Sequence, residues 1–357
     1  MVDIRLELAH DNRWLIALIA AGDWPALRDA LKEHQEELEA IDSRRGWTIL
    51  HYMCALPSIP NDIFETAVQL YPEATCIQGG APYGHLPLHV LCDNPDHSLR
   101  KAQILLEHMR PHDLLVTSHL RGSVIHHAYR KQAPISTLRE LIRANPKIVL
   151  LHHHYQFTAL HADQYGLMQT RYILKGIKVN EKRFQEYWDK VILIATVAFK
   201  QSPNYSRKME ANIEQYTLHG LQFLRAPNSI QRVAAKLHPE YVSIADGKGN
   251  YPLHNAIREA AGQNGMSLLD KEILSAFPEA AIKRNKKGCA PLFVAMRNGM
   301  TWEKGIKEFV LAHPESLFSI DHETGLCPFQ FAASLNEDAN METSYQLLCA
   351  NPSLLKA

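Results

Sequence analysis

The sequence predicts an all-α fold in which short helix pairs repeat along the chain. A motif that is fullest at Gly249–His254, with the pattern Gly-x-x-Pro-Leu-His, recurs many times. A proline follows most copies at a nearly constant distance, between 20 and 24 residues later. Apolar residues before these prolines recur every three or four positions, as on one face of an α-helix. Together these observations predict a helical repeat solenoid of about eight helix pairs.

The two markers run in phase. The motif copies end at His51, His89, His126, His161, His219, His254, Phe293 and Gln330. The closing prolines are Pro72, Pro111, Pro146, Pro239, Pro278, Pro314 and Pro352. Successive motif ends are separated by 38, 37, 35, 58, 35, 39 and 37 residues, so only one step, after His161, is anomalous.

Each repeat begins with a polar turn and continues into a first helix. In Asp246-Gly247-Lys248-Gly249, glycine permits the positive backbone angles of a tight reversal. Pro252 then stands at the start of the first helix, where its fixed φ is already helical and its missing N–H costs nothing. A second helix follows, and the closing proline disfavours helical backbone at the residue before it.

Residues 1–41 and 162–216 interrupt or precede this pattern. Trp14 to Leu31 has helical apolar spacing without the motif, so 1–41 is predicted to be an N-terminal capping helix pair. Ordinary repeats are expected over 42–161 and 217–357, the latter ending in the second helix of the last repeat. Between them, 162–216 is expected to hold an enlarged amphipathic helix at 181–200 and an exposed loop at 201–211.

Composition excludes several classes of protein. Lys plus Arg and Asp plus Glu are both 38, so no net charge attracts nucleic acid or an anionic membrane. The six cysteines are widely spaced, which favours reduced thiols. Asp3, Arg5 and Glu7 do not fit a secretory signal, and the longest apolar stretch, Val191–Phe199, is about half a membrane span. We therefore expect a monomeric cytoplasmic or nuclear protein.

The repeat resembles the ankyrin repeat, whose Thr-Pro-Leu-His signature is matched best at Gly249–His254. The resemblance covers nearly the whole chain and implies an ankyrin-like solenoid. The period of 35 to 39 residues is longer than the usual 33, and the second helix ends in proline rather than Gly-Ala. The extra residues fall between the helices, as in Leu56-Pro57-Ser58-Ile59-Pro60. This resemblance implies a fold and no activity.

Three constellations could carry chemistry, and each also has a structural interpretation. His51 with Cys54 and His89 with Cys92 have helical spacing for zinc, yet they occupy equivalent repeat positions. His152-His153-His154 with His161 is the densest imidazole cluster, in place of a polar turn. The basic run Lys283–Lys287 falls on a turn, where it could be a nuclear signal. The structural interpretation is favoured in every case.

The leading functional hypothesis is an interaction scaffold or adaptor that binds another protein through the concave face of the solenoid. The sequence contains no phosphate-binding glycine loop, nucleophile elbow or HExxH motif, so neither enzymatic activity nor a cofactor is expected. The alternative is a metal-binding or enzymatic protein with its site near His152–His161 and the inserted helix. The candidate partner-binding residues are Arg44, Arg45, Trp47, Tyr83, His85, His154, Tyr155, Phe157, Lys248, Asn250, Tyr251, Lys286 and Lys287.

Overall fold

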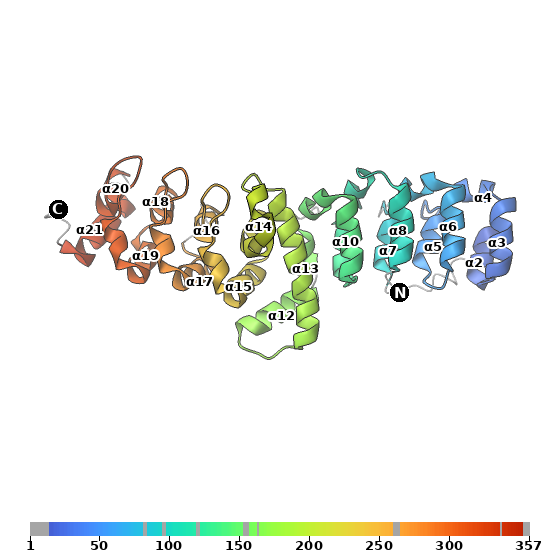
Figure 1. Cartoon of the computed structure of the whole chain (residues 1–357), viewed down its shortest axis with the longest axis horizontal. Coiled ribbons are helices and arrows are strands. Elements are labelled where there is room, and N and C mark those ends of the chain that lie inside the picture. Colours follow the sequence, from blue (N-terminus) through green and yellow to red (C-terminus); the bar gives the residue numbers. More distant parts are fainter. Residues whose placement is uncertain are drawn as a thin grey trace. The chain divides into compact units, whose positions relative to one another are not determined.

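The computed structural model has two compact units and is mostly helical, which confirms the all-α prediction. Unit 1 comprises Met1–Leu167 and Glu181–Val191, and unit 2 comprises Met168–Asn180 and Ile192–Ala357. The structure describes residues 14–80, 84–94, 98–118, 122–152, 157–162, 164–259, 265–335 and 338–352. Figure 1 shows the order of the helices. Each unit is described by itself.

Unit 1 begins with a helix pair, α2 (Trp14–Ala21) and α3 (Trp24–Glu33), where the sequence predicts one. Asp23 caps α3 by accepting a hydrogen bond from the backbone N–H of Ala26 at 3.1 Å. The short helix α4 (Glu36–Glu39) supplies Glu37, whose carboxylate accepts the N–H of Leu15 at the start of α2 at 2.9 Å. Because a carboxylate stabilises a helix N-terminus, α4 fastens this pair.

Three further helix pairs of unit 1, and the first helix of a fourth, follow the predicted frame. The first helices are α5 (Ile49–Ala55), α7 (Pro87–Asp93), α9 (Val124–Arg130) and the short α11 (Ala159–Ala162). The second helices are α6 (Asn61–Leu70), α8 (Leu99–His108) and α10 (Ile135–Ala144). Each first helix packs against the next first helix, and each second helix against the next second helix. A two-residue hairpin, β1 (Thr117–Ser118) and β2 (Gly122–Ser123), precedes α9.

Unit 2 repeats the same arrangement. Its first helices are α14 (Thr217–Phe223), α16 (Pro252–Glu259), α18 (Pro291–Arg297) and α20 (Pro328–Ser334). Its second helices are α15 (Asn228–Leu237), α17 (Leu268–Ala276), α19 (Lys307–Ala312) and α21 (Asp338–Ala350). Consecutive first helices are again in contact, as are α15 with α17 and α17 with α19. A π-helical turn, η7 (Trp302–Ile306), leads into α19.

The closing prolines start short 3₁₀ helices rather than only ending α-helices. These are η1 (Pro72–Cys76), η3 (Pro146–Leu150), η5 (Pro239–Ser243), η6 (Pro278–Ala281) and η8 (Pro314–Phe318), while η2 (Asp113–Leu115) begins two residues after Pro111. The residue before each such proline leaves the helical region, as Tyr71 does with φ −141° and ψ 75°. The proline ring then fixes the first φ of the 3₁₀ turn. The same proline therefore ends the α-helix and begins the 3₁₀ helix.

The enlarged segment contains α12 (Gln164–Leu174) and α13 (Glu181–Lys200), and the boundary between the two units divides both helices. The bounds of α13 match the predicted 181–200 helix, and Phe184, Trp188, Val191 and Ala195 are buried as its spacing predicts. In unit 2, a Cβ on Gly220 would lie 2.0 Å from the Ala195 carbonyl oxygen. Glycine at position 220 therefore lets α14 approach the backbone of α13 closely.

The prediction that 201–211 is simply an exposed loop was wrong in part. Ser202 is buried, and a 3₁₀ segment, η4 (Arg207–Tyr216), begins inside the predicted loop. An aromatic contact joins η4 to α13, because the ring of Tyr216 stacks on that of Phe199 with ring centroids 4.9 Å apart. Within the part of the chain that the structure describes, no helix is both long and apolar enough to cross a membrane.

Candidate binding site

The signature histidines join each first helix to the next repeat. The ring Nδ1 of His51 accepts the backbone N–H of Thr48 at 3.2 Å, and its Nε2 lies 2.9 Å from the carbonyl oxygen of His85. His254 does the same with Tyr251 at 3.1 Å and Cys289 at 3.0 Å. Since an accepting Nδ1 carries no proton, Nε2 must be the donor and each ring is the neutral tautomer.

Burial keeps these rings neutral. It lowers the pKa of His51 and of His254 to about 4, although the backbone hydrogen bond of each ring opposes the shift. Burial likewise lowers the pKa of His89 and of His219. Gln330 replaces histidine in the last copy, and its Oε1 accepts the N–H of Cys327 at 3.2 Å. The signature position is thus a capping position.

The His-Cys pairs are packed and not arranged as ligands. Burial raises the pKa of the Cys54 and Cys92 thiols well above the usual range, which disfavours the thiolate that zinc requires. No group of three or more His, Cys, Asp or Glu side chains in the described ranges is placed to hold a metal ion. In the histidine cluster, positions 153–156 lie outside the described residues, while His161 Nδ1 lies 3.0 Å from Thr158 Oγ1.

An aspartate or asparagine organises four of the turns, and the sequence reasoning missed it. Asp42 accepts the backbone N–H of Arg44, Arg45 and Trp47 at 2.6 to 2.8 Å. Asp246, Asn285 and Asp321 accept backbone N–H groups of their own turns in the same way. These four stand eight or nine residues before the last motif position. This nearly constant offset is the sequence signal from which these four residues could have been predicted.

Neighbouring turns are joined backbone to backbone. The N–H of Gly80 donates to the carbonyl of Arg45 at 2.6 Å, and in unit 2 the N–H of Lys286 donates to the carbonyl of Lys248 at 3.0 Å. Gly46 has φ +65°, and a Cβ there would lie 2.4 Å from the nitrogen of Gly80. Glycine is required at this turn both for its conformation and for the close approach of the next one.

The inserted segment takes the place of a turn at the start of this series in unit 2. The Asn204 carbonyl accepts the N–H of Gly247 at 2.8 Å, as a preceding turn would, and its side-chain amide donates to the carboxylate of Asp246 at 2.6 Å. A Cβ on Gly247 would lie 2.2 Å from that same carbonyl oxygen. The insertion therefore docks on the turn 246–250 instead of extending into solvent.

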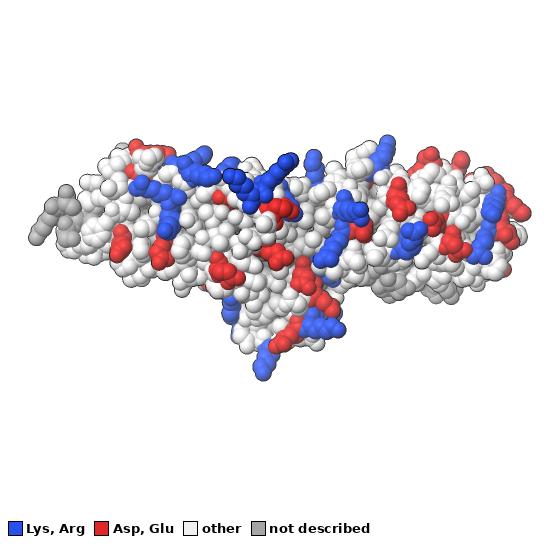
Figure 2. Space-filling view, in the orientation of Figure 1, with Lys and Arg blue, Asp and Glu red and all other residues white. Residues whose placement is uncertain are grey.

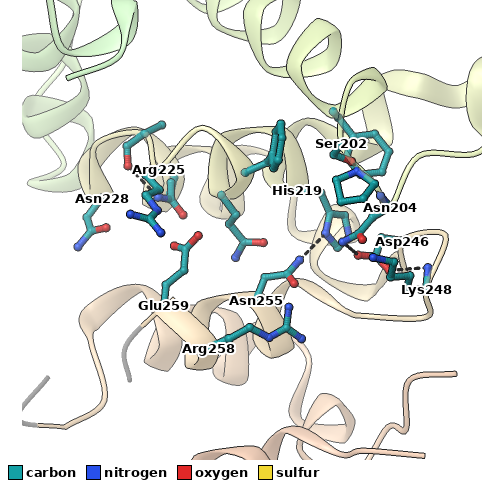
Figure 3. A pocket seen from close by; sticks show the side chains of 16 residues that line it. Ser202, Asn204, His219, Arg225, Asn228, Asp246, Lys248, Asn255, Arg258 and Glu259 are labelled. Atoms are coloured by element: carbon teal, nitrogen blue, oxygen red, sulfur yellow. Dashed lines mark hydrogen bonds between the residues drawn. The ribbon is translucent and has the colours of Figure 1, made fainter. Parts of the chain in front are cut away.

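A pocket of about 810 Å³ opens beside this contact within unit 2 (Figure 3). Its walls come from α14 and the start of α15, from α16, from the turn at Asp246 and Lys248, and from the inserted residues 202–204. Asn255 on α16 donates its amide to Nδ1 of His219 on α14 at 3.1 Å, and His219 Nε2 lies 2.9 Å from the carbonyl of Ile244. These contacts hold the pocket walls together.

Cations dominate the exposed rim of the pocket. Arg225, Arg258 and Lys248 are exposed, and their side-chain charges form no hydrogen bond or ion pair with the residues that the structure describes. The Asp246 carboxylate is saturated by the N–H groups of its turn and by Asn204. Burial raises the pKa of Glu259 to about 7, although the charge of Arg225 opposes the rise and part of the side chain is exposed to water.

Two amides in the pocket wall are only half satisfied. Gln222 donates to the carbonyl of Pro252 at 2.9 Å, and Gln231 donates to the carbonyl of Ala226 at 2.8 Å. The amide oxygen of each is buried and has no hydrogen-bond partner among the described residues.

In unit 1, the predicted site residues differ in how far they are exposed to solvent. Arg44 is exposed at its turn. The Arg45 guanidinium lies 4.9 Å from the centre of the Trp47 ring, and Trp47 in turn stacks on His51. Phe157 is 49 % exposed and stacks on His161. Tyr83, His154 and Tyr155 lie outside the described residues.

His85 requires a correction, because it is buried and not a surface residue of its turn. Only 7 % of it is exposed, and its ring is 5.0 Å from that of His127, in an edge-on arrangement.

His127 Nδ1 lies 3.1 Å from Asp93, and its Nε2 lies 3.4 Å from Ser118 Oγ. This Asp-His-Ser order resembles a catalytic triad, but Ser118 is buried and donates to the carbonyl of Gly122 at 2.9 Å. The cluster is part of the core.

In unit 2, the lysines are exposed and the neutral residues are not. Lys248, Lys286 and Lys287 are exposed, and Lys286 Nζ donates to the carbonyl of Gly247 at 2.7 Å. Asn250 is buried, bonding Asp246 and Asn285, so its predicted role in contacting a partner is corrected to one within the turn. Tyr251 is half-buried against His254. In Figure 2, Lys and Arg side chains gather over the turns before α16 and α18.

The pocket residues Arg225, Arg258 and Glu259 were not among the predicted site residues. Sequence reasoning placed the binding face on the turns and found no signal at the ends of the first helices. A structural signal does exist at Arg225, whose φ of +51° is rare for a residue other than glycine. No protein-family model and no curated protein matches the chain.

Proposed function

We propose that this chain is a protein-binding module built from ankyrin-like helical repeats. The repeated packing of first helix on first helix within each unit supports this proposal, as do the backbone bonds between successive turns. Stacked helix pairs of this kind form extended surfaces suited to recognising another protein. The binding surface is the side of the first helices and turns.

One observation carries the proposal. The rings of His51 and His254 and the side chains of Asp246 and Asn285 are hydrogen-bonded within the repeats, so these polar groups are not free for catalysis. Exposed cations on the turns of each unit, such as Arg44 in unit 1 and Lys248 and Lys287 in unit 2, form no side-chain hydrogen bond or ion pair with the described residues. Unpaired exposed cations on a rigid support are suited to contacting an acidic surface.

An affinity pull-down from the native cell tests the proposal. The test variant carries Arg44→Glu, Lys248→Glu and Lys287→Glu. The control carries the same change in charge on other surfaces, with Arg139→Glu, Lys182→Glu and Lys307→Glu. We expect a partner protein that is retained by wild type and by the control and is lost with the test variant. A partner retained equally by all three proteins would contradict the proposed surface.

A further inference from the structure

Arg225 has a left-handed backbone conformation in a turn that does not require an arginine. It follows the end of α14, and the N–H of Ala226 bonds to the carbonyl of Leu221 at 2.9 Å, which completes a left-handed helix end. Position 225 lies six residues after its motif position, as do Gln132 in unit 1 and Gly299 in unit 2. Gly299 has φ +78°, so glycine satisfies this turn without strain.

The strain at Arg225 suggests that its side chain serves another purpose. Residues other than glycine in left-handed conformation persist where the surroundings or a function compensate for their cost. The Arg225 guanidinium lines the pocket and makes no hydrogen bond or close ion pair with the described residues, although it lies near enough to Glu259 to attract its carboxylate. Figure 3 shows it facing Glu259 of α16, while the Arg258 side chain points away from it and lies below Asn255. The outlier therefore places a cation at the pocket mouth.

The shape of the pocket favours an extended chain over a small molecule. Small-molecule sites enclose most of their ligand. Here the three cations Arg225, Arg258 and Lys248 lie exposed on three separate elements. Phe223 lines the same pocket and is 42 % exposed, so it offers an apolar contact beside the charges. A ligand that reaches all four must be elongated, acidic and in part apolar.

The charge of the lining favours a peptide over a nucleic acid. Nucleic-acid sites gather many Lys and Arg side chains along a basic stripe. This pocket instead includes the carboxylates Asp246 and Glu259, and the chain has no net formal charge. A regular row of phosphates would meet the exposed Glu259 carboxylate, whereas a peptide can place its acidic residues only where the cations lie.

We propose that this pocket binds an acidic segment of the partner protein, with carboxylates paired to Arg225, Arg258 and Lys248 and an apolar side chain on Phe223. The inference rests on the proposed protein-binding function and specifies its site. Glu259 lines the same pocket and faces Arg225, so in its ionised form it competes with a ligand carboxylate for that cation. The inserted residues 202–204 form one wall, which gives the insertion a role in the site.

The test uses the purified full chain and a short fluorescein-labelled peptide of alternating glutamate and leucine, with anisotropy as the readout. A peptide with glutamine in place of glutamate is the neutral probe. We expect Arg225→Gly to weaken binding of the acidic peptide about three- to fivefold, and Arg225→Gly with Arg258→Ala about tenfold. We expect Glu259→Gln to strengthen it about threefold, and salt to weaken it in every case.

Two controls separate binding from folding. Gln132→Gly makes the same backbone change at the equivalent position of unit 1, and Arg139→Ala removes an exposed cation from α10. Both should bind the acidic peptide as wild type does. Because glycine suits position 225, the Arg225→Gly protein should melt no lower than wild type, so weaker binding cannot be assigned to unfolding.

Three results would overturn the inference. These are equal affinity for the acidic and neutral peptides, unchanged affinity in the Arg225→Gly and Arg258→Ala protein, or tighter binding of a single-stranded oligonucleotide with the same arginine dependence. The pull-down distinguishes this failure from failure of the proposed function. A partner captured through the turn cations but insensitive to Arg225 and Arg258 would retain the module and remove the pocket.

Discussion

His51 and His254 use both ring nitrogens, so each of the two has one permitted protonation state in the fold. Protonation of His51 or His254 would convert the accepting Nδ1 into a donor facing a backbone N–H. The unfolded chain has no such restriction, and its histidines titrate near a pKa of about 6.5. A difference between the two states in proton affinity makes stability depend on pH.

Acidification should destabilise the protein well before its carboxylates titrate. The folded pKa of His51 and His254 is about 4, below the unfolded value, so the unfolded chain binds more protons between these limits. Their stabilising contribution is complete above pH ~6.5 and is lost as the pH falls toward 4. At pH 5 the expected loss is about 2 kcal/mol for each histidine. Urea unfolding midpoints at pH 7 and pH 5 measure it.

A substitution provides the control for this pH effect. His254→Gln removes one titrating group, and its amide oxygen can still accept the N–H of Tyr251, as Gln330 does for Cys327. The variant should show a shallower decline in unfolding midpoint between pH 7 and pH 5. A decline as steep as in wild type would mean that other groups cause it.

Arg225→Gly should stabilise unit 2 by up to about 1 kcal/mol. The left-handed conformation costs an ordinary residue roughly 1 to 2 kcal/mol, and the larger backbone entropy of unfolded glycine offsets part of the gain. Arg225 has φ +51° and no ion pair in the described residues to compensate. Differential scanning calorimetry of the variant beside Gln132→Gly measures the effect. A lower melting temperature would show that the arginine side chain holds the fold together.

At the scale of elements, turns and helices differ in how well the sequence predicts them. The bounds of α13 and the positions of the first and second helices followed from apolar spacing and prolines. The docking of Asn204 on Asp246 could not follow, because a hydrogen bond across 42 residues leaves no local pattern. Buried His85 was expected at the surface because a turn is usually exposed, yet its ring packs against His127.

The pocket was missed for a related physical reason. Its charged residues come from the end of one first helix and the end of the next, and only packing brings them together. The positive φ of Arg225 could not be predicted from the sequence, because arginine rarely adopts this conformation. Sequence reasoning could find Lys248 because it lies in a turn that the motif defines.

The contact between α13 and α14 is an element-scale feature that one methyl group should disrupt. Gly220→Ala would place a Cβ 2.0 Å from the Ala195 carbonyl, which is backbone and cannot move aside easily. Overpacking of this kind costs about 1 to 3 kcal/mol, more than the helix propensity gained by alanine. Urea unfolding measures the loss. A variant at least as stable as wild type would show that the two helices can separate at little cost.

The turn 246–250 and the insertion should loosen together. Asp246→Ala removes the acceptor of the Asn250 N–H and of the Asn204 amide, so residues 201–206 lose an anchor. We expect faster proteolytic cleavage in 201–206 than in wild type. Asp42→Ala, the matched change in unit 1, should leave cleavage there unchanged. Equal cleavage of wild type and Asp246→Ala would show that the Gly247 bond to Asn204 suffices.

At the scale of the whole molecule, stability is distributed along consecutive helix pairs. Each first helix contacts the first helices before and after it within its unit, so a local defect acts first on its neighbours. Proteins of this kind open in segments rather than all at once. The chain has two compact units, each with buried apolar side chains of its own.

A cavity in one helix pair should therefore be felt locally. Phe293→Ala removes a buried ring of α18 that packs edge-on against Phe331, with centroids 5.3 Å apart. The cost should be about 3 to 5 kcal/mol. Hydrogen exchange should accelerate most in α16, α18 and α20, and least in α2 and α3. Uniform acceleration across all helices would show that the chain unfolds as a single cooperative block.

The neutral histidines also give the protein a set of internal spectroscopic reporters. A buried Nε2–H that donates to the carbonyl of the following repeat exchanges slowly with water, so its proton signal persists in an NMR spectrum. His51 and His254 each mark a different boundary between repeats, with carbonyl distances of 2.9 and 3.0 Å. Loss of one signal while the other remains would identify which boundary opens under urea, heat or a bound partner, with no probe attached.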